Sequence, residues 1–203
     1  QNITTLRERE VKIFGPAQGV QACGETGEGR MLDPDELVLQ CISLFTNHSL
    51  TAKKVVITAG PTLEPIDPVR FISNRSSGKM GYAIADAAME AGAQVTVISG
   101  PTHLQENKRI NYVHVETAQQ MHTAVMQQCT DADLFIATAA VADYQPLNID
   151  KQKIKKNEDL ISMQLTRTPD ILKEIKLSQP NLFCVGFAAE TENLIENAKT
   201  KLQ

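Results

Sequence analysis

From Lys53 onward, short apolar runs alternate along the chain with stretches of helical periodicity. Apolar runs typical of buried parallel strands occupy 53–59, 94–99, 112–115, 134–137 and 182–187, and 163–165 is a further short candidate. Apolar residues recur at helical spacing in 78–91, 118–129 and 170–177, and residues from 193 onward are helical in pattern. This alternation predicts an α/β fold, a Rossmann-like three-layer αβα arrangement around a mostly parallel sheet.

The helix predicted over 78–91 has both an apolar face and a sequence signal for its end. Its apolar face is predicted to be Met80, Ala83, Ile84, Ala87 and Ala91, and Gly92 is the stop signal. Ligands of such a fold are expected beyond the carboxyl ends of the strands.

The first fifty residues follow a different pattern. Residues 2–10 predict a helix, 11–14 a short strand, and 15–31 form a glycine-rich segment. A second helix is predicted to begin at Asp33–Pro34, with Asp33 as N-cap and Pro34 in the first turn, and to end at Phe45. Residues 46–51 have linker character. We therefore expect two domains, residues 1–50 and 51–203.

Charge and composition restrict the classes of partner that the protein is expected to bind. The net charge of −4 argues against nucleic acid, because phosphate backbones select basic surfaces. No apolar run approaches the roughly 20 residues that span a bilayer, and the first residues show no signal peptide. The 4 cysteines are widely spaced, as in reduced cytosolic proteins. We expect a cytoplasmic protein with neither nucleic-acid nor membrane partners.

The strongest chemical signal is the long loop after the first predicted strand, TAGPTLEPIDPVRFISNRSSGKMG. It is much longer than an ordinary connection between a strand and a helix, which predicts a functional role. It ends in Ser-Ser-Gly-Lys at a helix start, where free backbone N–H groups favour an anion, and Arg70, Arg75 and Lys79 add positive charge. A capped helix with solvated charges is the alternative. The spacing matches neither a Walker A loop nor GxGxxG.

Three further segments carry candidate chemistry. The small residues of 137–144, ATAAVADY, would let a base or phosphate approach the backbone, with Asp143 near a ribose, base or metal; an alanine-rich packing turn is the alternative. The four lysines of 151–156 are typical of a solvated surface, yet an ammonium group there would suit charge developing on phosphorus. Phe187 ends the last strand as either a core residue or a stacking platform.

Together these segments closely resemble the phosphopantothenoylcysteine synthetase domain of the bacterial bifunctional decarboxylase/synthetase of coenzyme A biosynthesis. The matching stretches are the long loop, ATAAVADY, KIKK, TPDIL and VGFAAET, in the expected order between Val55 and Thr191. The resemblance implies a CTP-dependent phosphopantothenate–cysteine ligase. The carboxylate of 4'-phosphopantothenate would attack the α-phosphate of CTP, with Mg²⁺ held by the triphosphate. The amine of cysteine would then displace CMP from the acyl-cytidylate. A homodimer of synthetase domains is also implied.

The resemblance also implies roles for individual residues. Asn74 would orient the acyl intermediate for attack by cysteine, supported by Arg70, and Lys153 would face the charge at the α-phosphate. The nucleotide site would comprise Ala137, Thr138, Ala139, Ala140, Asp143, Lys153, Pro169, Asp170, Ile171, Leu172, Phe187 and Lys201. The phosphate loop would comprise Gly60, Ser76, Ser77, Gly78 and Gly81.

Residues 21–31 resemble the substrate flap of the decarboxylase half of the same family. Cys23 would be its proton donor, although the residues alone show only a thiol in a glycine-rich loop. The family's flavin-binding segments lie upstream of such a flap, so FMN and decarboxylation are expected only of the full-length protein. The synthetase domain is expected to be truncated at its C-terminus.

Two other classes compete with the ligase. A nicotinamide-dependent oxidoreductase on the same fold should show GxGxxG after the first strand and an acidic residue further along the chain. A catalytically inert binding subunit would keep the fold and lose the reactive side chains, whereas Asn74 and Lys153 are both present.

Overall fold

The computed structural model describes residues 2–20, 26–44, 49–155 and 162–187. The chain divides into two compact units, Gln1–Asn47 and His48–Gln203. The sequence placed a domain boundary after residue 50.

The first unit contains two helices and a hairpin. Helix α1 spans Asn2–Glu8, strands β1 (Ala17–Val20) and β2 (Thr26–Arg30) pair antiparallel, and α2 spans Pro34–Ser43. The strand predicted over 11–14 is wrong, because these residues form no strand. The glycine-rich segment supplies two strands that pair locally, whereas 11–14 have no partner strand among the described residues of the unit.

Helix α2 begins at the predicted proline, but the predicted capping hydrogen bond to the Asp33 side chain is not formed. Pro34 stands in its first turn, with Asp35 and Glu36 placed favourably for the helix dipole. Asp33 occupies the N-cap position, but its side chain makes no capping bond and instead accepts a hydrogen bond from Arg30 Nη2 at 3.3 Å. Neither helix of the unit buries a side chain, and Leu32 is the buried apolar residue among the described residues of the unit.

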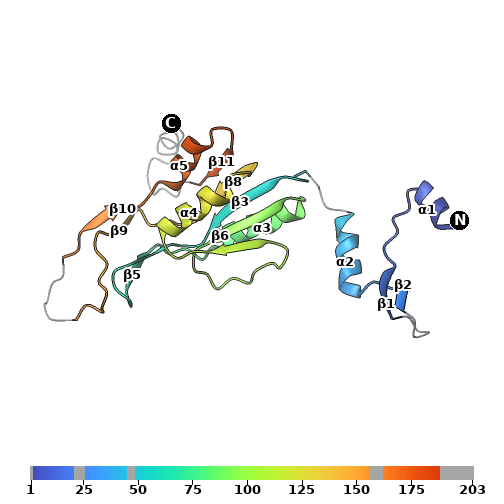
Figure 1. The fold of residues 1–203 in the computed structure, drawn as a ribbon, viewed down its shortest axis with the longest axis horizontal. Helices are drawn as coiled ribbons and strands as arrows, with labels where there is room; N and C mark the ends of the chain where they lie inside the picture. Colours follow the sequence, from blue (N-terminus) through green and yellow to red (C-terminus); the bar gives the residue numbers. More distant parts are fainter. Residues whose placement is uncertain (1, 21–25, 45–48, 156–161, 188–203) are drawn as a thin grey trace. The chain divides into compact units, whose positions relative to one another are not determined.

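The second unit is built on a parallel five-stranded sheet (Figure 1). Its strands are β3 (Lys54–Ala59), β6 (Gln94–Ser99), β7 (Asn111–His114), β8 (Leu134–Ala137) and β11 (Phe183–Gly186), in the spatial order β11-β8-β3-β6-β7. The chain moves from β3 toward β7 and then returns to the other side of β3. The strand order therefore reverses between β3 and β8, which is where such sheets bind ligands.

Helices cover both faces of this sheet. Helix α3 (Lys79–Glu90) packs on one face, over a cluster that includes Val55, Ile57 and Val97. Helices α4 (Ala118–Gln128) and α5 (Ile171–Ser178) pack over the other cluster, which includes Val56 and Phe135. The alternation of neighbouring β3 side chains between the two clusters is the period of a strand buried on both faces. The predicted Rossmann-like αβα arrangement is confirmed.

The predicted apolar face of α3 is wrong for most of its positions, although Ile84 does pack against the core cluster under the helix. The buried positions are Gly81, Tyr82, Ala85 and Ala88, whereas Met80 is 46% exposed. A Cβ atom on Gly81 would lie 2.5 Å from Thr138 Oγ1 and 2.6 Å from Ala59 Cβ, so the helix approaches the sheet through its bare glycine backbone. This close approach sets the rotation of the helix and turns Met80 toward solvent.

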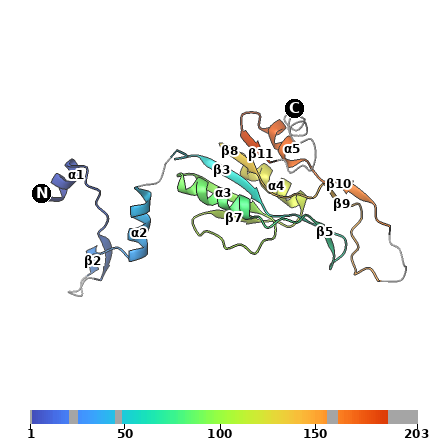
Figure 2. The same ribbon diagram turned by 180° about the vertical axis from the view of Figure 1, so that it is seen from behind.

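Two short hairpins extend from the same end of the unit (Figures 1 and 2). Strands β4 (Leu63–Pro65) and β5 (Phe71–Ser73) pair within the long loop, and β9 (Tyr144–Pro146) pairs with β10 (Leu165–Arg167). The sequence anticipated β10 two residues early and missed the other three strands. Across the described part of the chain, no helix combines the length and apolarity needed to cross a membrane.

Candidate active site

The reversal of strand order brings two predicted segments together. Beyond the carboxyl ends of β3 and β8, Ala140 N donates to Gly60 O at 2.9 Å, and Thr138 N donates to Thr58 O at 3.2 Å. Pro61 and Ala140 form an isolated parallel bridge. The long loop and the ATAAVADY segment therefore lie side by side beyond the carboxyl ends of β3 and β8, where open α/β sheets bind ligands.

Two glycines allow the end of β3 and the start of α3 to approach each other closely. Gly60 and Gly78 both have positive φ angles, 76° and 75°, and a Cβ on Gly78 would lie 3.2 Å from the Gly60 backbone. Gly78 is the N-cap of α3 and has no side-chain cap, while its own N–H donates to Ser76 Oγ at 3.3 Å. The first turn of α3 thus presents backbone N–H groups and the positive end of the helix dipole, which suit a phosphate. Gly81 serves the packing of α3 against the sheet.

Asn74 joins the long loop to the ATAAVADY turn. Its Nδ2 donates to Val141 O at 2.9 Å and is 3.4 Å from Ala140 O. Thr62 adds a second connection, because its Oγ1 accepts a hydrogen bond from Ala142 N at 3.0 Å. Asn74 is therefore held across the ATAAVADY turn, and the residue is exposed.

The TPDIL segment continues from the ATAAVADY turn. Thr168 N donates to Asp143 O at 3.0 Å, and Asp143 itself is exposed. Asp170 caps α5, since its Oδ1 accepts a hydrogen bond from Lys173 N at 3.1 Å. Ile171 is buried in the core, so any contact it makes with a nucleotide would use its backbone. Phe187 is 51% exposed, which leaves its ring accessible for stacking.

Arg70 contacts the neighbour of Lys153 rather than Asn74. Arg70 Nη2 donates to Ile154 O at 3.0 Å, and Arg70 Nε donates to Asp67 Oδ2 at 2.9 Å. Asp67 is buried, and its hydrogen bonds from the Arg70 side chain hold the pKa of its carboxyl group well below the usual range. Lys153 is exposed and immediately precedes Ile154.

Several predicted residues lie outside the described part of the chain. They are Cys23, Lys156, Lys201 and the end of the VGFAAET segment, residues 188–191.

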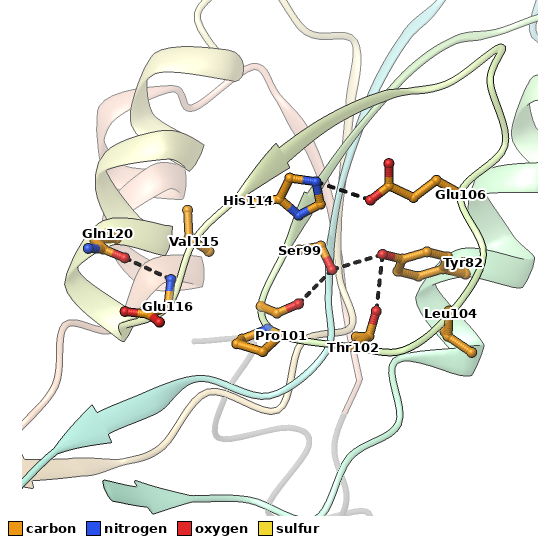
Figure 3. A pocket seen from close by; sticks show the side chains of 11 residues that line it. Tyr82, Ser99, Pro101, Thr102, Leu104, Glu106, His114, Val115, Glu116 and Gln120 are labelled. Atoms are coloured by element: carbon orange, nitrogen blue, oxygen red, sulfur yellow. Dashed lines mark hydrogen bonds and ion pairs between the residues drawn. The ribbon is translucent and has the colours of Figure 1, made fainter. Parts of the chain in front are cut away.

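A cavity of about 340 Å³ that the sequence did not anticipate lies beyond the ends of β6 and β7 (Figure 3). On one side Tyr82, Ser99 and Thr102 form a chain of hydroxyl groups, with oxygen–oxygen distances of 3.1 and 3.2 Å. On the other side His114 Nε2 lies 3.0 Å from Glu106 Oε1. Glu116 adds a second carboxylate to the lining, which makes the cavity unsuitable for a phosphate. The signal in the sequence was Gly100–Pro101 directly after a buried strand.

The described residues fit neither a protein-held metal ion nor a flavin. Within the described ranges no group of three or more His, Cys, Asp or Glu side chains could hold a metal ion. An isoalloxazine ring needs apolar walls, and the described residues of the first unit, where only Leu32 is a buried apolar residue, do not form them. Burial raises the pKa of Cys129 to about 12, which makes its thiol a poor nucleophile.

Comparisons with known proteins place the chain among proteins of coenzyme A biosynthesis. The family described as "DNA/pantothenate metabolism flavoprotein C-terminal domain" matches residues 50–203. The coenzyme A biosynthesis bifunctional protein CoaBC of Vibrio vulnificus strain YJ016 is 50% identical over 206 residues, covering 100% of this chain and 51% of that protein. A cysteine/cysteine sulfinic acid decarboxylase of an unknown prokaryotic organism is 43% identical over 210 residues, covering 100% of this chain and 58% of that protein.

A solved structure agrees with these relatives. The crystal structure of the C-terminal domain of a CoaBC protein matches with a TM-score of 0.68 and 46% identity, covering 77% of this chain and 74% of that one. The chain spans about half the length of the curated relatives that it matches.

Proposed function

We propose that this chain, which belongs to the DNA/pantothenate metabolism flavoprotein C-terminal domain family, is the CTP-dependent phosphopantothenate–cysteine ligase part of a coenzyme A biosynthesis protein. It would activate the carboxylate of 4'-phosphopantothenate as an acyl-cytidylate and then form the amide bond with cysteine. The nicotinamide-dependent oxidoreductase is not favoured, because the family match and the long loop both point elsewhere.

The observation that carries this proposal is the meeting of the long loop with the ATAAVADY turn at the reversal of strand order. The glycines at the start of α3, which would suit a phosphate, lie there beside the small-residue turn of Ala137–Asp143. Asn74 connects the two through its hydrogen bonds to Ala140 and Val141. A substrate with a phosphate at one end and a carboxylate at the other would lie across these two segments beside a nucleotide.

The chemistry needs positioning more than covalent catalysis. A carboxylate is a poor acyl donor, and a mixed anhydride with CMP gives it a good leaving group. The attack at the α-phosphate gathers negative charge, which an ammonium group such as that of Lys153 would stabilise. Mg²⁺ would arrive with the triphosphate and neutralise part of that charge. The base of CTP would meet the backbone of Ala137–Ala140, with Pro169, Leu172 and Phe187 beside it.

Pyrophosphate release from CTP is the experiment that tests the ligase. We expect release to depend on 4'-phosphopantothenate and to be weaker with ATP in place of CTP. Release that needs no phosphopantothenate, or none with either nucleotide, would refute the proposal.

Decarboxylation is a second candidate, because the relatives include a protein named as a cysteine/cysteine sulfinic acid decarboxylase. In this family FMN belongs to the decarboxylase, and Cys23 would be the proton donor. Release of carbon dioxide from phosphopantothenoylcysteine, measured with and without added FMN, distinguishes this activity from the ligase. We expect no release from this chain alone, since its described first-unit residues do not form a flavin site.

Replacing Asn74 with Asp is expected to block the second half-reaction more than the first. The aspartate would lose both Nδ2 hydrogen bonds and turn a carboxylate toward the carbonyl oxygens of Ala140 and Val141, disturbing the seat of the acyl group. In single-turnover assays the acyl-cytidylate should accumulate. Asn111→Asp, at an exposed residue of β7, is the control. Equal loss of both steps would remove Asn74 from this role.

We also propose that the ligase unit forms a homodimer through its two hairpins. Large apolar side chains exposed on and beside them are Val69, Phe71, Tyr144, Leu147, Ile149, Met163 and Leu165. An apolar surface of this kind marks a protein–protein interface.

Replacing Leu165 with Glu should convert the dimer to a monomer, because a charge would be buried at the interface. The molecular mass from light scattering is the measurement. Leu177→Glu, at a 72% exposed residue of α5, should leave the dimer intact. A monomeric unmodified chain, or a dimer that tolerates Leu165→Glu, would contradict the proposed interface.

A further inference from the structure

The tip of the β4–β5 hairpin holds a distant segment at both of its ends. At one end Asp150 N donates to Ile66 O at 3.0 Å. At the other, Ile154 N donates to Asp67 Oδ2 at 3.1 Å, and Arg70 Nη2 donates to Ile154 O at 3.0 Å. We call the side chains of Asp67 and Arg70 with the backbone of Ile154 the hairpin clamp.

Asp67 is the centre of the hairpin clamp. Its side chain is fully buried, and Oδ1 accepts hydrogen bonds from Val69 N at 2.8 Å and Arg70 N at 2.9 Å. Oδ2 accepts from the Arg70 guanidinium and from Ile154 N. One carboxylate therefore shapes the turn, fixes the guanidinium and holds the amide of Ile154.

Arg70 completes the hairpin clamp with geometry that only a guanidinium provides. Its Nε and Nη2 contact Asp67, while Nη2 also reaches the carbonyl oxygen of Ile154. Both backbone polar groups of Ile154 are thus satisfied by the hairpin. A lysine has one terminal nitrogen on a flexible stem and could not hold this forked arrangement.

We propose that Asp67 and Arg70 are positioning residues that fix the backbone carrying Lys153. The inference rests on the proposed function, in which Lys153 neutralises charge at the α-phosphate. Lys153 is exposed and directly precedes the held residue Ile154, so the clamp determines where its side chain starts. Because the clamp fixes the backbone beside Lys153, less conformational entropy is lost when the lysine side chain binds the phosphate.

A double-mutant comparison tests whether Arg70 acts through Lys153. Arg70→Lys should slow acyl-cytidylate formation on the order of 100-fold, the effect of a small displacement of a catalytic group, with little change in the KM for CTP. In a Lys153→Gln background the same change should cause almost no further loss, because residues that act as a unit are not additive. Arg109→Lys, at an exposed arginine, should leave the rate unchanged.

The proposal would be overturned if the double variant lost rate by the product of the two single-variant factors. Arg70 would then act on the substrate directly or through general stability. A second variant, Asp67→Asn, keeps the shape of the side chain and removes its charge. It should show the same dependence on Lys153, and full activity of this variant would also contradict the clamp.

A structural readout separates failure of the clamp from failure of the proposed function. Hydrogen exchange of the Ile154 amide should accelerate in Arg70→Lys and Asp67→Asn, while exchange in β3 stays slow. If the unmodified chain releases no pyrophosphate from CTP, the proposed function fails. The clamp itself is then judged by this exchange, and unchanged exchange at Ile154 would refute it.

Discussion

Replacing Lys153 with Gln is expected to slow formation of the acyl-cytidylate by roughly 10²- to 10³-fold, the usual effect of removing a group aimed at transition-state charge. Glutamine keeps most of the length of the side chain and the hydrogen-bonding capacity, so the loss reports the missing positive charge. Rapid-quench measurement of acyl-cytidylate in a single turnover checks the result.

The matched control for this prediction is Lys155→Gln. Lys151, Lys153 and Lys155 are all exposed, but Lys153 alone directly precedes the residue held by Asp67 and Arg70. Lys155 should therefore contribute much less to the rate. If the three lysines proved equivalent when each is replaced with Gln, the run would be a general electrostatic attraction for the triphosphate.

Replacing Gly100 with Ala is expected to lower both stability and activity strongly. A Cβ atom there would overlap the carbonyl oxygen of Pro61 and lie 2.8 Å from the Pro61 carbon. The neighbour is backbone in a buried turn, so relief requires moving the long loop away from β6. We expect a loss of about 3 kcal/mol in the free energy of unfolding, as for severe overpacking. That corresponds to a fall in Tm of roughly 6–12 °C.

The same displacement would separate the long loop from the ATAAVADY turn. Pro61 bridges Ala140, and Thr62 binds Ala142 N, so the Gly100→Ala change should also weaken nucleotide binding. Gly186→Ala is the control for stability alone, because its added Cβ would meet Leu172 Cδ2, the movable end of a flexible side chain. A Tm for Gly100→Ala as high as that of Gly186→Ala would contradict the prediction, because the long loop would then move at little energetic cost.

The sheet and its helices were predictable because each obeys a local rule. Val55 to Ala59 are all buried, and a strand buried on both faces shows as a continuous apolar run. Gly92, with a φ of 93°, ends α3 in the way that a glycine stop signal predicts. Asp170 caps α5 through Lys173 N, as its place before the helix indicated.

The features that were missed depend on contacts between distant residues. The rotation of α3 follows from the contact of Gly81 with Ala59 and Thr138, which apolar periodicity does not contain. The β4–β5 hairpin pairs within a loop where Pro65 and Pro68 interrupt the sequence and each strand has only 3 residues, too few to show a strand pattern. The bond from Arg70 to Ile154 joins residues 84 positions apart, which no local sequence pattern contains. The support of Arg70 for Asn74 was implied by the family resemblance and stays a prediction.

The sequence indicated which segments form the candidate site better than it indicated how their residues contact one another. The glycines and Asn74 do lie with the ATAAVADY turn, because the carboxyl ends of adjacent parallel strands meet at one edge. The cavity beside Ser99 and Tyr82 was missed, since its lining comes from single residues of separate elements.

Oxygen-18 transfer tests the central claim most directly. Phosphopantothenate labelled in its carboxylate is incubated with CTP, Mg²⁺, cysteine and the protein, and the products are analysed by mass spectrometry. An acyl-cytidylate intermediate requires one labelled oxygen to appear in the phosphate of CMP, with unlabelled pyrophosphate. Label in inorganic phosphate together with CDP would instead show activation as an acyl phosphate and contradict the account.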